Sequence, residues 1–323
     1  MKKVGIIGGA GYTAGELIRI ILQHPKVALD FVYSTSNAGN KISSIHQDLV
    51  GDTDMCFSNT INPFIDVLFL CLGHGNSKVF LEENNFSEQT RIIDLSNDFR
   101  MSQEAVFKNI PFVYGLPEMQ KEAIKKAKYI ANPGCFATAI QLALLPLALK
   151  KLLQNEVHIN AVTGATGAGT SLSETTHFTW RDNNFSHYKA FTHQHLGEIN
   201  QTLHQLENNA SVYFISNRGN FSRGIFATMY TQFEGSLEEA KTLYKKYFET
   251  AKFTVVSDDE IHLKQVVNTN KCLLHLHKHN NQLLITSCID NLLKGASGQA
   301  VQNMNLMFGF EETDGLNLKA NFF

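Results

Sequence analysis

The chain has 323 residues, of which 43% are hydrophobic and 18% are charged, and its formal net charge is −2. This composition is typical of a globular protein with one large domain or two smaller ones, and it excludes a disordered chain. The charge balance gives no basic excess for nucleic acid or an anionic membrane, and the longest apolar segment, 136–149, is too short to span a bilayer.

The five cysteines are widely spaced, and no C-x-x-C pair occurs. This spacing indicates neither a zinc site nor a disulfide framework, so no metal is expected. Reduced thiols in the cytoplasm are the simplest interpretation. Any basic residues that bind an anionic substrate must therefore act locally, in a small-molecule site.

The N-terminal segment predicts a dinucleotide-binding unit. An apolar strand at 4–7 precedes a glycine-rich turn, a helix that ends near residue 24, and a second strand at 29–34. Gly9, Gly11 and Ala14 match the G-x-G-x-x-G/A fingerprint, in which bare backbone approaches a pyrophosphate at the helix N-terminus. The residues predicted to bind the cofactor here are Gly8, Gly11, Tyr12, Thr13 and Ala14.

The end of the second strand indicates which nucleotide is bound. Residues 33–37 contain no acid to bind a ribose 2′-hydroxyl, which NAD sites usually provide. Ser34 and Ser36 leave room for a 2′-phosphate and can donate to it, and Lys41 is a nearby cation. We therefore predict NADP(H) as the cofactor.

Two more buried strands, at 66–72 and 91–95, extend the expected parallel sheet. Arg100 follows the second of them and can bind an anionic substrate group or form an ion pair with Asp98. A short strand at 129–131 then leads into Asn132-Pro133-Gly134-Cys135. Residues 1–132 are thus expected to form a doubly wound sheet, with Cys135 at its edge.

Cys135 has the position of an activated nucleophile. It follows an Asn-Pro-Gly turn and begins an apolar run long enough for a helix. The unpaired N–H groups of a helix N-terminus favour thiolate over thiol and can hold an oxyanion. The alternative is a small buried cysteine that only packs.

The second half of the chain has a different pattern. A strand at 156–162 precedes a glycine-rich loop at 163–171 and a long irregular segment at 177–195, and such segments are usually functional. His193 and His195 do not share a helix face and have no obvious third partner, so a metal site is disfavoured. One of them can act as general base toward Cys135, and Glu198 can orient His195 from the next helical turn.

The remaining segments predict a mixed sheet and a final helix. Strands are expected over 212–232, 272–277 and 282–288, and an open sheet face could pair with a second subunit. Arg218 and Arg223 each lie beside a glycine, which suits a phosphate or carboxylate pocket. The helix from Ser297 begins with small residues that allow close approach to the nucleotide.

Several of these motifs together resemble the N-acetyl-gamma-glutamyl-phosphate reductase family of arginine biosynthesis, within the semialdehyde dehydrogenase superfamily. They occur in the family's order over nearly the whole chain: Gly-Tyr-Thr at 11–13, Asp98-Phe99-Arg100, Tyr114 to Glu118, Asn132 to Cys135, the loop at 164–169, His193-x-His195 with Glu198, Arg223-Gly224-Ile225, and Asp290-Asn291-Leu292 through Met304. The resemblance implies an α/β fold with an N-terminal Rossmann-type parallel sheet at 1–132, joined by about 296–323. It also implies a mixed α+β catalytic and dimerisation domain at 133–295, with the C-terminal helix packing back on the nucleotide domain.

The resemblance also implies an activity and roles for residues. The activity is NADPH-dependent reductive dephosphorylation of an N-acyl-glutamyl 5-phosphate through a thioester on Cys135, in a cytoplasmic homodimer or homotetramer. His195 or His193 would be the acid and base, with His195 favoured by its neighbour Glu198. Asn303 is expected at the cofactor, and Arg100, Asn132 and Arg223 at the substrate. The roles of Arg181 and Arg218 stay open.

The chain departs from the family at Ala14, Gln194 and residues 215–221, and the last two lie where the substrate should bind. The acyl group therefore stays open between acetyl and succinyl. Aspartate-semialdehyde dehydrogenase and a non-catalytic dinucleotide sensor are the other hypotheses. The Asn-Pro-Gly-Cys context disfavours the first, and the retained cysteine and histidines disfavour the second.

Overall fold

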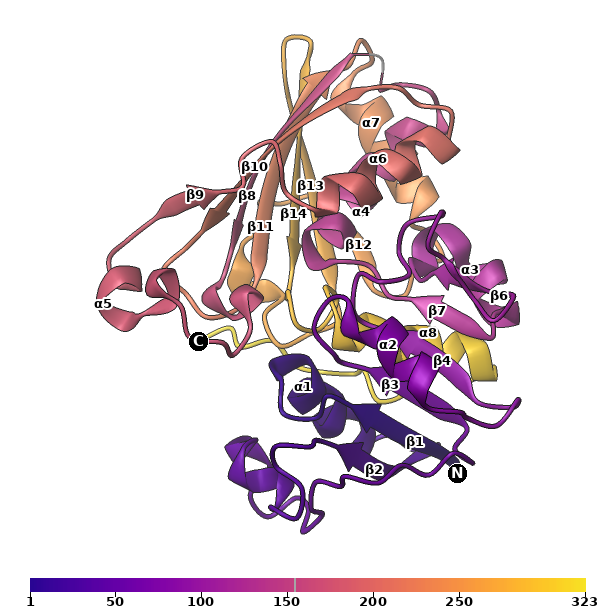
Figure 1. The fold of residues 1–323 in the computed structure, drawn as a ribbon. Helices are drawn as coiled ribbons and strands as arrows, with labels where there is room; N and C mark the ends of the chain where they lie inside the picture. Colours follow the sequence, from indigo (N-terminus) through magenta and orange to yellow (C-terminus); the bar gives the residue numbers. More distant parts are fainter. Residues whose placement is uncertain (154) are drawn as a thin grey trace. The chain divides into compact units, whose positions relative to one another are not determined.

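The computed structural model describes residues 1–153 and 155–323. The chain forms two compact units (Figure 1). The first comprises Met1–Pro133 and Ala296–Asn317, and the second comprises Gly134–Gly295 and Leu318–Phe323. Each unit is built around one seven-stranded sheet.

The first unit contains the expected Rossmann-type sheet. Its strand order is β2-β1-β3-β4-β7-β6-β5, and every neighbouring pair is parallel except β5 with β6. Strand β3, near the middle of the sheet, is apolar and buried along its whole length, as a strand covered on both faces requires. The strands are β1 (Lys2–Ile7), β2 (Val27–Tyr33), β3 (Val67–Leu70), β4 (Arg91–Asp94), β5 (Val106–Phe107), β6 (Ile110–Tyr114) and β7 (Tyr129–Ala131).

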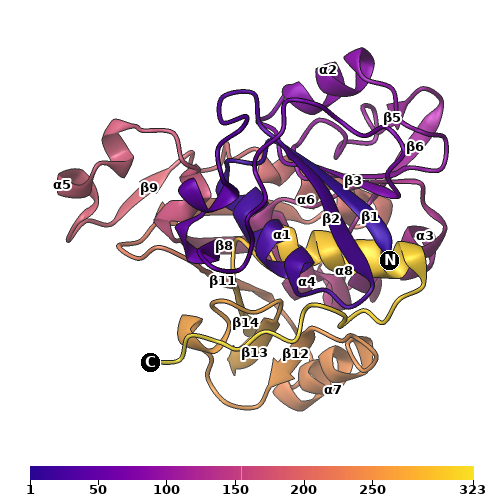
Figure 2. The same cartoon turned by 90° about the horizontal axis from the view of Figure 1, so that it is seen from below.

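The helices of the first unit include the C-terminal one, α8 (Ser297–Phe308), which packs against α1 (Tyr12–Leu22) and α3 (Pro117–Lys126). Figure 2 shows α1 and α8 side by side. The helix α8 is buried almost all round, and its small first residues allow this close packing. The expected return of the C-terminal helix to the nucleotide domain is confirmed. The remaining helix of this unit is α2 (Asn76–Glu83).

The second unit contains the expected mixed sheet. Its strand order is β12-β13-β14-β11-β8-β10-β9, with parallel pairs at β8–β10 and β12–β13 and antiparallel pairs elsewhere. The strands are β8 (Glu156–Thr163), β9 (Ser186–Tyr188), β10 (Ser211–Arg218), β11 (Ile225–Gln232), β12 (Thr254–Ser257), β13 (Cys272–His279) and β14 (Gln282–Ile289).

The helices α4 (Cys135–Leu149), α6 (His195–Gln205) and α7 (Leu237–Tyr247) cover one face of this sheet (Figure 1). Residues along β8 alternate between buried and less buried, as a sheet with one covered face requires. Helix α4 is buried from Phe136 to Ala148, and the Tyr244 hydroxyl of α7 donates to its Ala143 carbonyl at 2.6 Å. This core fixes where α4 begins.

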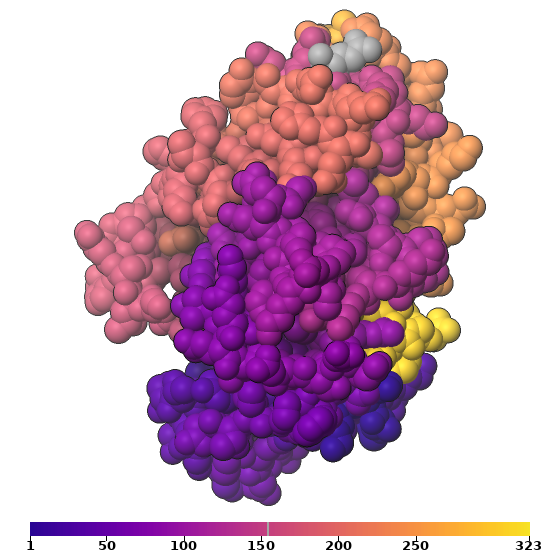
Figure 3. All heavy atoms as spheres, turned by 45° about the vertical axis from the view of Figure 1, so that its right-hand side comes forward, coloured from indigo at the N-terminus to yellow at the C-terminus, as the bar shows by residue number. Residues whose placement is uncertain are grey.

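Two features of the second unit differ from the sequence expectation. The irregular segment before α6 contains the short helix α5 (Phe178–Arg181) and strand β9, which pairs with β10 (Figure 1). In the space-filling view, pink atoms of this part of the chain project at the edge of the second unit (Figure 3). The last six residues, expected with the nucleotide domain, belong instead to the second unit. The Asn321 amide donates to the Val267 carbonyl at 3.1 Å, and this bond holds the tail there.

Candidate active site

Cys135 is the first residue of α4 and is half-buried. Gly134 is its N-cap and has extended backbone, and no side chain of the described residues caps this end of the helix. The N-terminal end of a helix carries a partial positive charge, which favours a negative charge at the sulfur of Cys135. Local structure places the thiol where the sequence predicted it.

His195 lies against the same helix end. A Cβ atom at Gly134 would lie 2.3 Å from Nε2 of His195, so only glycine leaves room for this ring beside Cys135. The Gly134 amide donates to Oε2 of Glu198 at 2.9 Å, and Oε1 of Glu198 lies 4.0 Å from Nε2 of His195. Glu198 thus joins the first turn of α6 to the N-cap of α4.

His193 lies behind His195 and is enclosed by rings. Its ring centroid lies 4.7 Å from that of His195 and between 5.3 and 5.8 Å from those of Phe136, Tyr188 and Phe214. Its Nδ1 accepts a hydrogen bond from the His195 amide at 3.2 Å. Burial, assisted by Lys189, lowers the pKa of His193 to about 4, so this imidazole is neutral at pH 7.

The buried, neutral His193 gives a prediction for acid stability. Between pH 6.5 and 4 the unfolded chain binds a proton at this residue and the folded chain does not, so the free energy of unfolding falls as the pH falls through this window. We expect this group to contribute a loss on the order of 2 kcal/mol. His193→Asn keeps an acceptor for the His195 amide but does not titrate, so its stability should depend less on pH.

The measurement is denaturant unfolding at pH 7, 5.5 and 4.5, followed by fluorescence of the single tryptophan, Trp180, in the second unit. His193→Asn is expected to start less stable, because ring packing is lost. Equal pH dependence in the wild-type and variant proteins would contradict the proposed neutral state.

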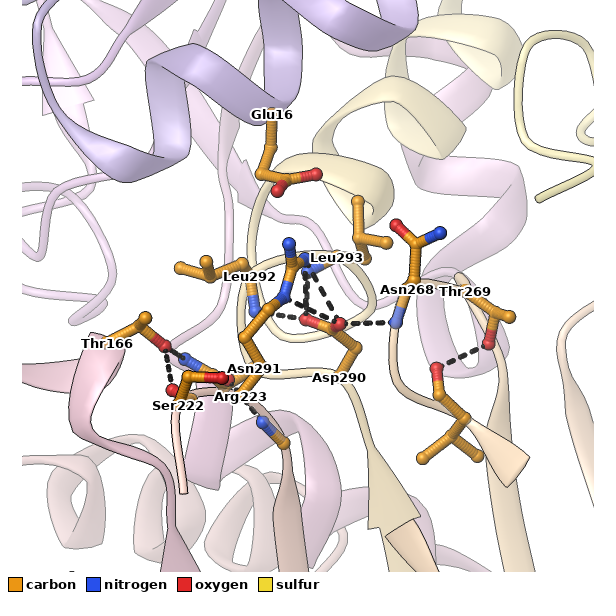
Figure 4. A network of polar contacts seen from close by, with 12 residues as sticks. Glu16, Thr166, Ser222, Arg223, Asn268, Thr269, Asp290, Asn291, Leu292 and Leu293 are labelled. Carbon is orange, nitrogen blue, oxygen red and sulfur yellow. Dashed lines mark hydrogen bonds and ion pairs between the residues drawn. The ribbon is translucent and has the colours of Figure 1, made fainter. Parts of the chain in front are cut away.

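The segment 290–295 closes the site on the other side of Cys135. A Cβ atom at Gly295 would lie 2.7 Å from Cβ of Cys135, so glycine is needed for this approach. Asp290 is fully buried and accepts hydrogen bonds from the Leu292 and Leu293 amides at 2.8 and 3.1 Å (Figure 4). These bonds fix the turn that carries Gly295.

Arg223, predicted at the substrate, is part of this network. Its Nε and Nη2 donate to the two carboxylate oxygens of Asp290 at 3.1 and 3.2 Å (Figure 4). The Asn268 amide donates to the same carboxylate, and Asn291 joins the Gly224 amide to the Thr166 hydroxyl. These contacts of Arg223 hold the turn in place, and its predicted role at the substrate stays a prediction.

In the first unit the glycine turn has the geometry of a pyrophosphate site. Gly8 has φ +80°, and a Cβ atom there would lie 2.6 Å from the Cys71 carbonyl oxygen. A Cβ at Gly11, by contrast, would have only the Gly8 oxygen near it, at 4.0 Å, so open space lies above the N-cap of α1. Ala14 is buried under this turn, and the Thr13 carbonyl accepts from the Ser297 hydroxyl at 2.7 Å. Tyr12 begins α1, and the turn's bare backbone fits a dinucleotide.

The segment after β2 brings the predicted serines together. Nδ2 of Asn37 donates to the hydroxyls of Ser34 and Ser36 at 3.3 and 3.1 Å. Lys41 forms an ion pair with Asp54 at 2.7 Å, and the Asp54 side chain is 93% exposed. This pair raises the pKa of Lys41 and lowers that of Asp54. No carboxylate follows directly on β2.

Arg100, Asn132 and Asn303 form a buried network within the first unit. Nε of Arg100 donates to the Asn132 carbonyl at 2.8 Å, and Nη2 donates to the Leu95 carbonyl. Nδ2 of Asn132 donates to the Ala296 carbonyl, and Nδ2 of Asn303 donates to Oδ1 of Asn132 and to the Gly115 carbonyl. Asp98, the alternative partner expected for Arg100, instead accepts hydrogen bonds from the Gly75 and Lys78 amides at the start of α2.

Two family models match the two units. The NAD binding domain of semialdehyde dehydrogenase matches residues 3–127, and the semialdehyde dehydrogenase dimerisation domain matches residues 135–291. Curated N-acetyl-gamma-glutamyl-phosphate reductases of Christiangramia forsetii and Flavobacterium johnsoniae are 66% and 62% identical, with 100% of both chains covered. The chain belongs to this family of reductases. The relatives are oxidoreductases, and the chain is an enzyme of the same family.

Solved structures of other enzymes share the fold of this reductase. Aspartate semialdehyde dehydrogenase II of Vibrio cholerae, complexed with ASA, has a TM-score of 0.71 at 15% identity, covering 96% of this chain and 98% of that one. The NADP-bound aspartate semialdehyde dehydrogenase of Candida albicans has a TM-score of 0.66 at 13% identity, covering 95% and 99%. At these identities the likeness concerns architecture alone.

Tyr188 is a candidate site residue of this reductase that no sequence motif marks. Burial, assisted by the charge of the nearby Cys135, raises its pKa to about 12, although Arg218 acts in the opposite direction. Its position depends on β9 pairing with β10, where Tyr188 is opposite Ser216. No local motif marks such a pairing. The cluster of aromatic and basic residues over 177–195 was the only signal.

Within residues 1–153 and 155–323, no three His, Cys, Asp or Glu side chains gather as a metal site would require. In the same part of the chain, no helix is both long and apolar enough to cross a membrane.

Proposed function

We propose that the enzyme catalyses NADPH-dependent reductive dephosphorylation of N-acetyl-L-glutamyl 5-phosphate to N-acetyl-L-glutamate 5-semialdehyde, in arginine biosynthesis. The observation that carries the proposal is the convergence of Cys135, His195 and Glu198 at the N-cap of α4. A thiol at a helix N-terminus beside an imidazole is the arrangement that covalent acyl transfer requires. The five free cysteines are consistent with a cytoplasmic enzyme.

In the first half of the reaction, His195 accepts the thiol proton and the sulfur of Cys135 attacks the acyl carbon. Backbone N–H groups of the first turn of α4 stabilise the oxyanion. The carbon–oxygen bond to phosphate breaks, and phosphate leaves with the electron pair and the proton from His195. A thioester on Cys135 remains. An acyl phosphate suits this chemistry because it is already activated.

A nicotinamide cofactor, when bound, supplies a hydride to the thioester carbon. His195 stabilises the resulting tetrahedral oxyanion with a proton taken up from solvent. The carbon–sulfur bond then breaks, the carbonyl re-forms and the aldehyde leaves. The proton passes to the sulfur, which restores the thiol of Cys135. Glu198 keeps the His195 ring oriented, and His193 supports it through the hydrogen bond from the His195 amide.

The test is the reverse reaction, reduction of NADP at alkaline pH in the presence of phosphate or arsenate. N-acetyl- and N-succinyl-glutamate 5-semialdehyde are offered in parallel, with aspartate semialdehyde as the control. We expect turnover of an N-acyl substrate and not of the control. The succinyl substrate is the alternative, because Gln194 and residues 215–221 depart from the family pattern. Failure of all three substrates with the cofactor still bound would overturn the proposed activity.

The NADP preference gives a prediction at Lys41. We propose that Lys41 exchanges its exposed partner Asp54 for the cofactor's 2′-phosphate. Lys41→Ala should raise the KM for NADPH roughly fivefold or more and leave the KM for NADH unchanged. Asp54→Asn, the matched control, should not raise either constant. Equal shifts for both cofactors in Lys41→Ala would contradict this assignment.

We also propose that the enzyme is a homodimer or a homotetramer, with the uncovered face of the second sheet in the subunit contact. His158 stacks between Tyr213 and Tyr230, at centroid distances of 5.3 and 5.0 Å, and the two tyrosines are 39% and 47% exposed. Such an exposed aromatic cluster is typical of an interface. The match to a dimerisation domain supports this proposal.

Tyr213→Asp is expected to lower the molecular mass measured by light scattering toward that of one chain, because a charge would be buried unpaired in the contact. Val255→Asp, at another partly exposed position of the same sheet, is the control and should leave the mass unchanged. A Tyr213→Asp protein of unchanged mass would place the contact elsewhere.

A further inference from the structure

Arg181 and Arg218 lie together in the second unit and have no role in the mechanism above. Arg218 ends β10, and Arg181 ends α5, which precedes β9. Arg181 is only 7% exposed although α5 is a single turn. Arg218 pairs with Ser186 of β9, only five residues after Arg181, so the chain brings the two cations into the same part of the unit. Burial lowers the pKa of Arg181, and the charge of Arg218 contributes to this shift.

Several polar atoms here are buried with no hydrogen-bond partner among the described residues: Nε and Nη1 of Arg181, Nε of Arg218 and Oγ1 of Thr163. Arg181 makes one side-chain bond, from Nη2 to the Asn184 carbonyl at 3.1 Å. None of the ion pairs in the described part of the chain includes either guanidinium group. Arg181 is buried and Arg218 is half-buried. Guanidinium donors left unused in such surroundings are costly, and an oxyanion would satisfy both the charge and the donors.

These side chains lie on the face of the sheet that carries the candidate active site. Arg218 is directly opposite Thr163 of β8, so their side chains lie on the same face of the sheet. Phe214, four residues before Arg218 on the same strand, is on that face as well, and its ring packs against Phe136 and His193. The Arg218 guanidinium lies 4.7 Å from the ring centroid of Tyr188. The Tyr188 ring centroid lies 5.8 Å from that of His193, whose ring packs against His195 beside the N-cap of Cys135. The two arginines therefore lie close to the residues that surround Cys135.

Both arginines are held in place by flat side chains. Arg218 stacks on Tyr188, and Arg181 lies 5.1 Å from the ring centroid of Trp180. Stacking leaves the edge of a guanidinium group, which carries its N–H donors, free to meet a planar or tetrahedral oxyanion. Lysines at these positions would keep the charge and lose the fork of donors.

We propose that Arg181 and Arg218, with the Thr163 hydroxyl, form an oxyanion-binding subsite that holds a carboxylate or phosphoryl group of the substrate while its acyl carbon reacts at Cys135. The proposal rests on the proposed function for the identity of the substrate. An N-acyl-glutamyl phosphate offers its phosphoryl group and its α-carboxylate, and an N-succinyl group adds a second carboxylate. The experiment distinguishes these sources.

The variants are Arg181→Gln and Arg218→Gln, with Arg218→Lys as the conservative replacement and Thr163→Val as a replacement of nearly equal shape. Lys252→Gln, an exposed cation elsewhere in the second unit, is the control. Binding of inorganic phosphate, N-acetyl-L-glutamate and N-succinyl-L-glutamate is followed by the fluorescence of Trp180, which lies against Arg181. Steady-state constants are measured in the reverse assay.

We expect Arg181→Gln and Arg218→Gln to raise the Kd of one class of probe and the KM of the matching substrate by roughly 10- to 100-fold, with a much smaller change in kcat. Arg218→Lys should restore part of the loss, Thr163→Val should cause a few-fold loss, and Lys252→Gln should match the wild type. If only the Kd for phosphate rises, the subsite binds the phosphoryl group of the substrate. If the Kd rises for both N-acyl compounds, it binds the α-carboxylate. If the Kd rises for N-succinyl-L-glutamate alone, it binds the carboxylate of the acyl group.

The subsite is overturned if Kd and KM stay within about twofold of the wild type for every probe in both glutamine variants and in Thr163→Val. It is also overturned if the variants change only the molecular mass in light scattering, because the arginines would then serve a subunit contact. If the wild-type enzyme turns over no N-acyl substrate but loses probe binding in Arg181→Gln, the proposed function fails and the subsite stands.

Discussion

Cys135→Ser is expected to lower kcat by roughly 10⁴-fold or more while leaving the affinity for NADPH unchanged. A serine hydroxyl at this position is hardly ionised at neutral pH and cannot replace the thiolate, even with the N–H groups of α4 nearby. The nucleotide turn belongs to the first unit and is not altered by the substitution. The measurements are steady-state turnover and direct cofactor binding on the same preparations.

Cys56→Ser is the matched control, because Cys56 is exposed and belongs to the first unit. It should retain wild-type turnover. A Cys135→Ser enzyme with more than a few per cent of wild-type kcat would exclude covalent catalysis at this residue. A protein that never turned over, but bound the cofactor equally in both forms, would fit a dinucleotide sensor instead.

His195→Asn is expected to lower kcat by roughly 10²- to 10⁴-fold, the usual contribution of a positioned acid and base. His195 contacts the N-cap glycine of Cys135, and Glu198 orients it. His193→Asn should lower kcat less than about tenfold, because its ring is neutral and enclosed and its Nδ1 serves the His195 amide. The two variants are compared in the same turnover assay.

The pH profile separates a chemical role from a structural one. Loss of an acid and base should remove one ionisation from the kcat profile of His195→Asn, while the profile of His193→Asn should keep it. If His193→Asn alone abolished activity and His195→Asn did not, the roles proposed for the two histidines would be wrong.

The sequence was informative where a function depends on a short, local pattern. The strand and glycine turn before α1 predicted the parallel sheet, because buried parallel strands are continuously apolar and a nucleotide turn needs bare backbone. The start of α4 at Cys135 followed from the Asn-Pro-Gly turn and the apolar run behind it. The mixed second sheet and the packing of α8 were also confirmed.

Long-range pairing was not predictable in the same way. Arg223 meets Asp290 across 67 residues, and only the folded sheet brings them together. Tyr188 and Arg218 are joined by β9, a strand too short to show a period of its own. The Arg100 side chain bonds main-chain carbonyls, which no side-chain motif records. The last six residues join the second unit through a main-chain bond for the same reason.

Acylation of Cys135 can be observed directly by mass spectrometry. The enzyme is mixed with N-acetyl-L-glutamyl 5-phosphate without cofactor, and the intact mass and the labelled peptide are determined. We expect one acyl group per chain, on the peptide that contains Cys135, which is lost when NADPH is added and is absent in Cys135→Ser. An enzyme that turns over this substrate but shows no acyl group on Cys135, or keeps the label in Cys135→Ser, would contradict the account.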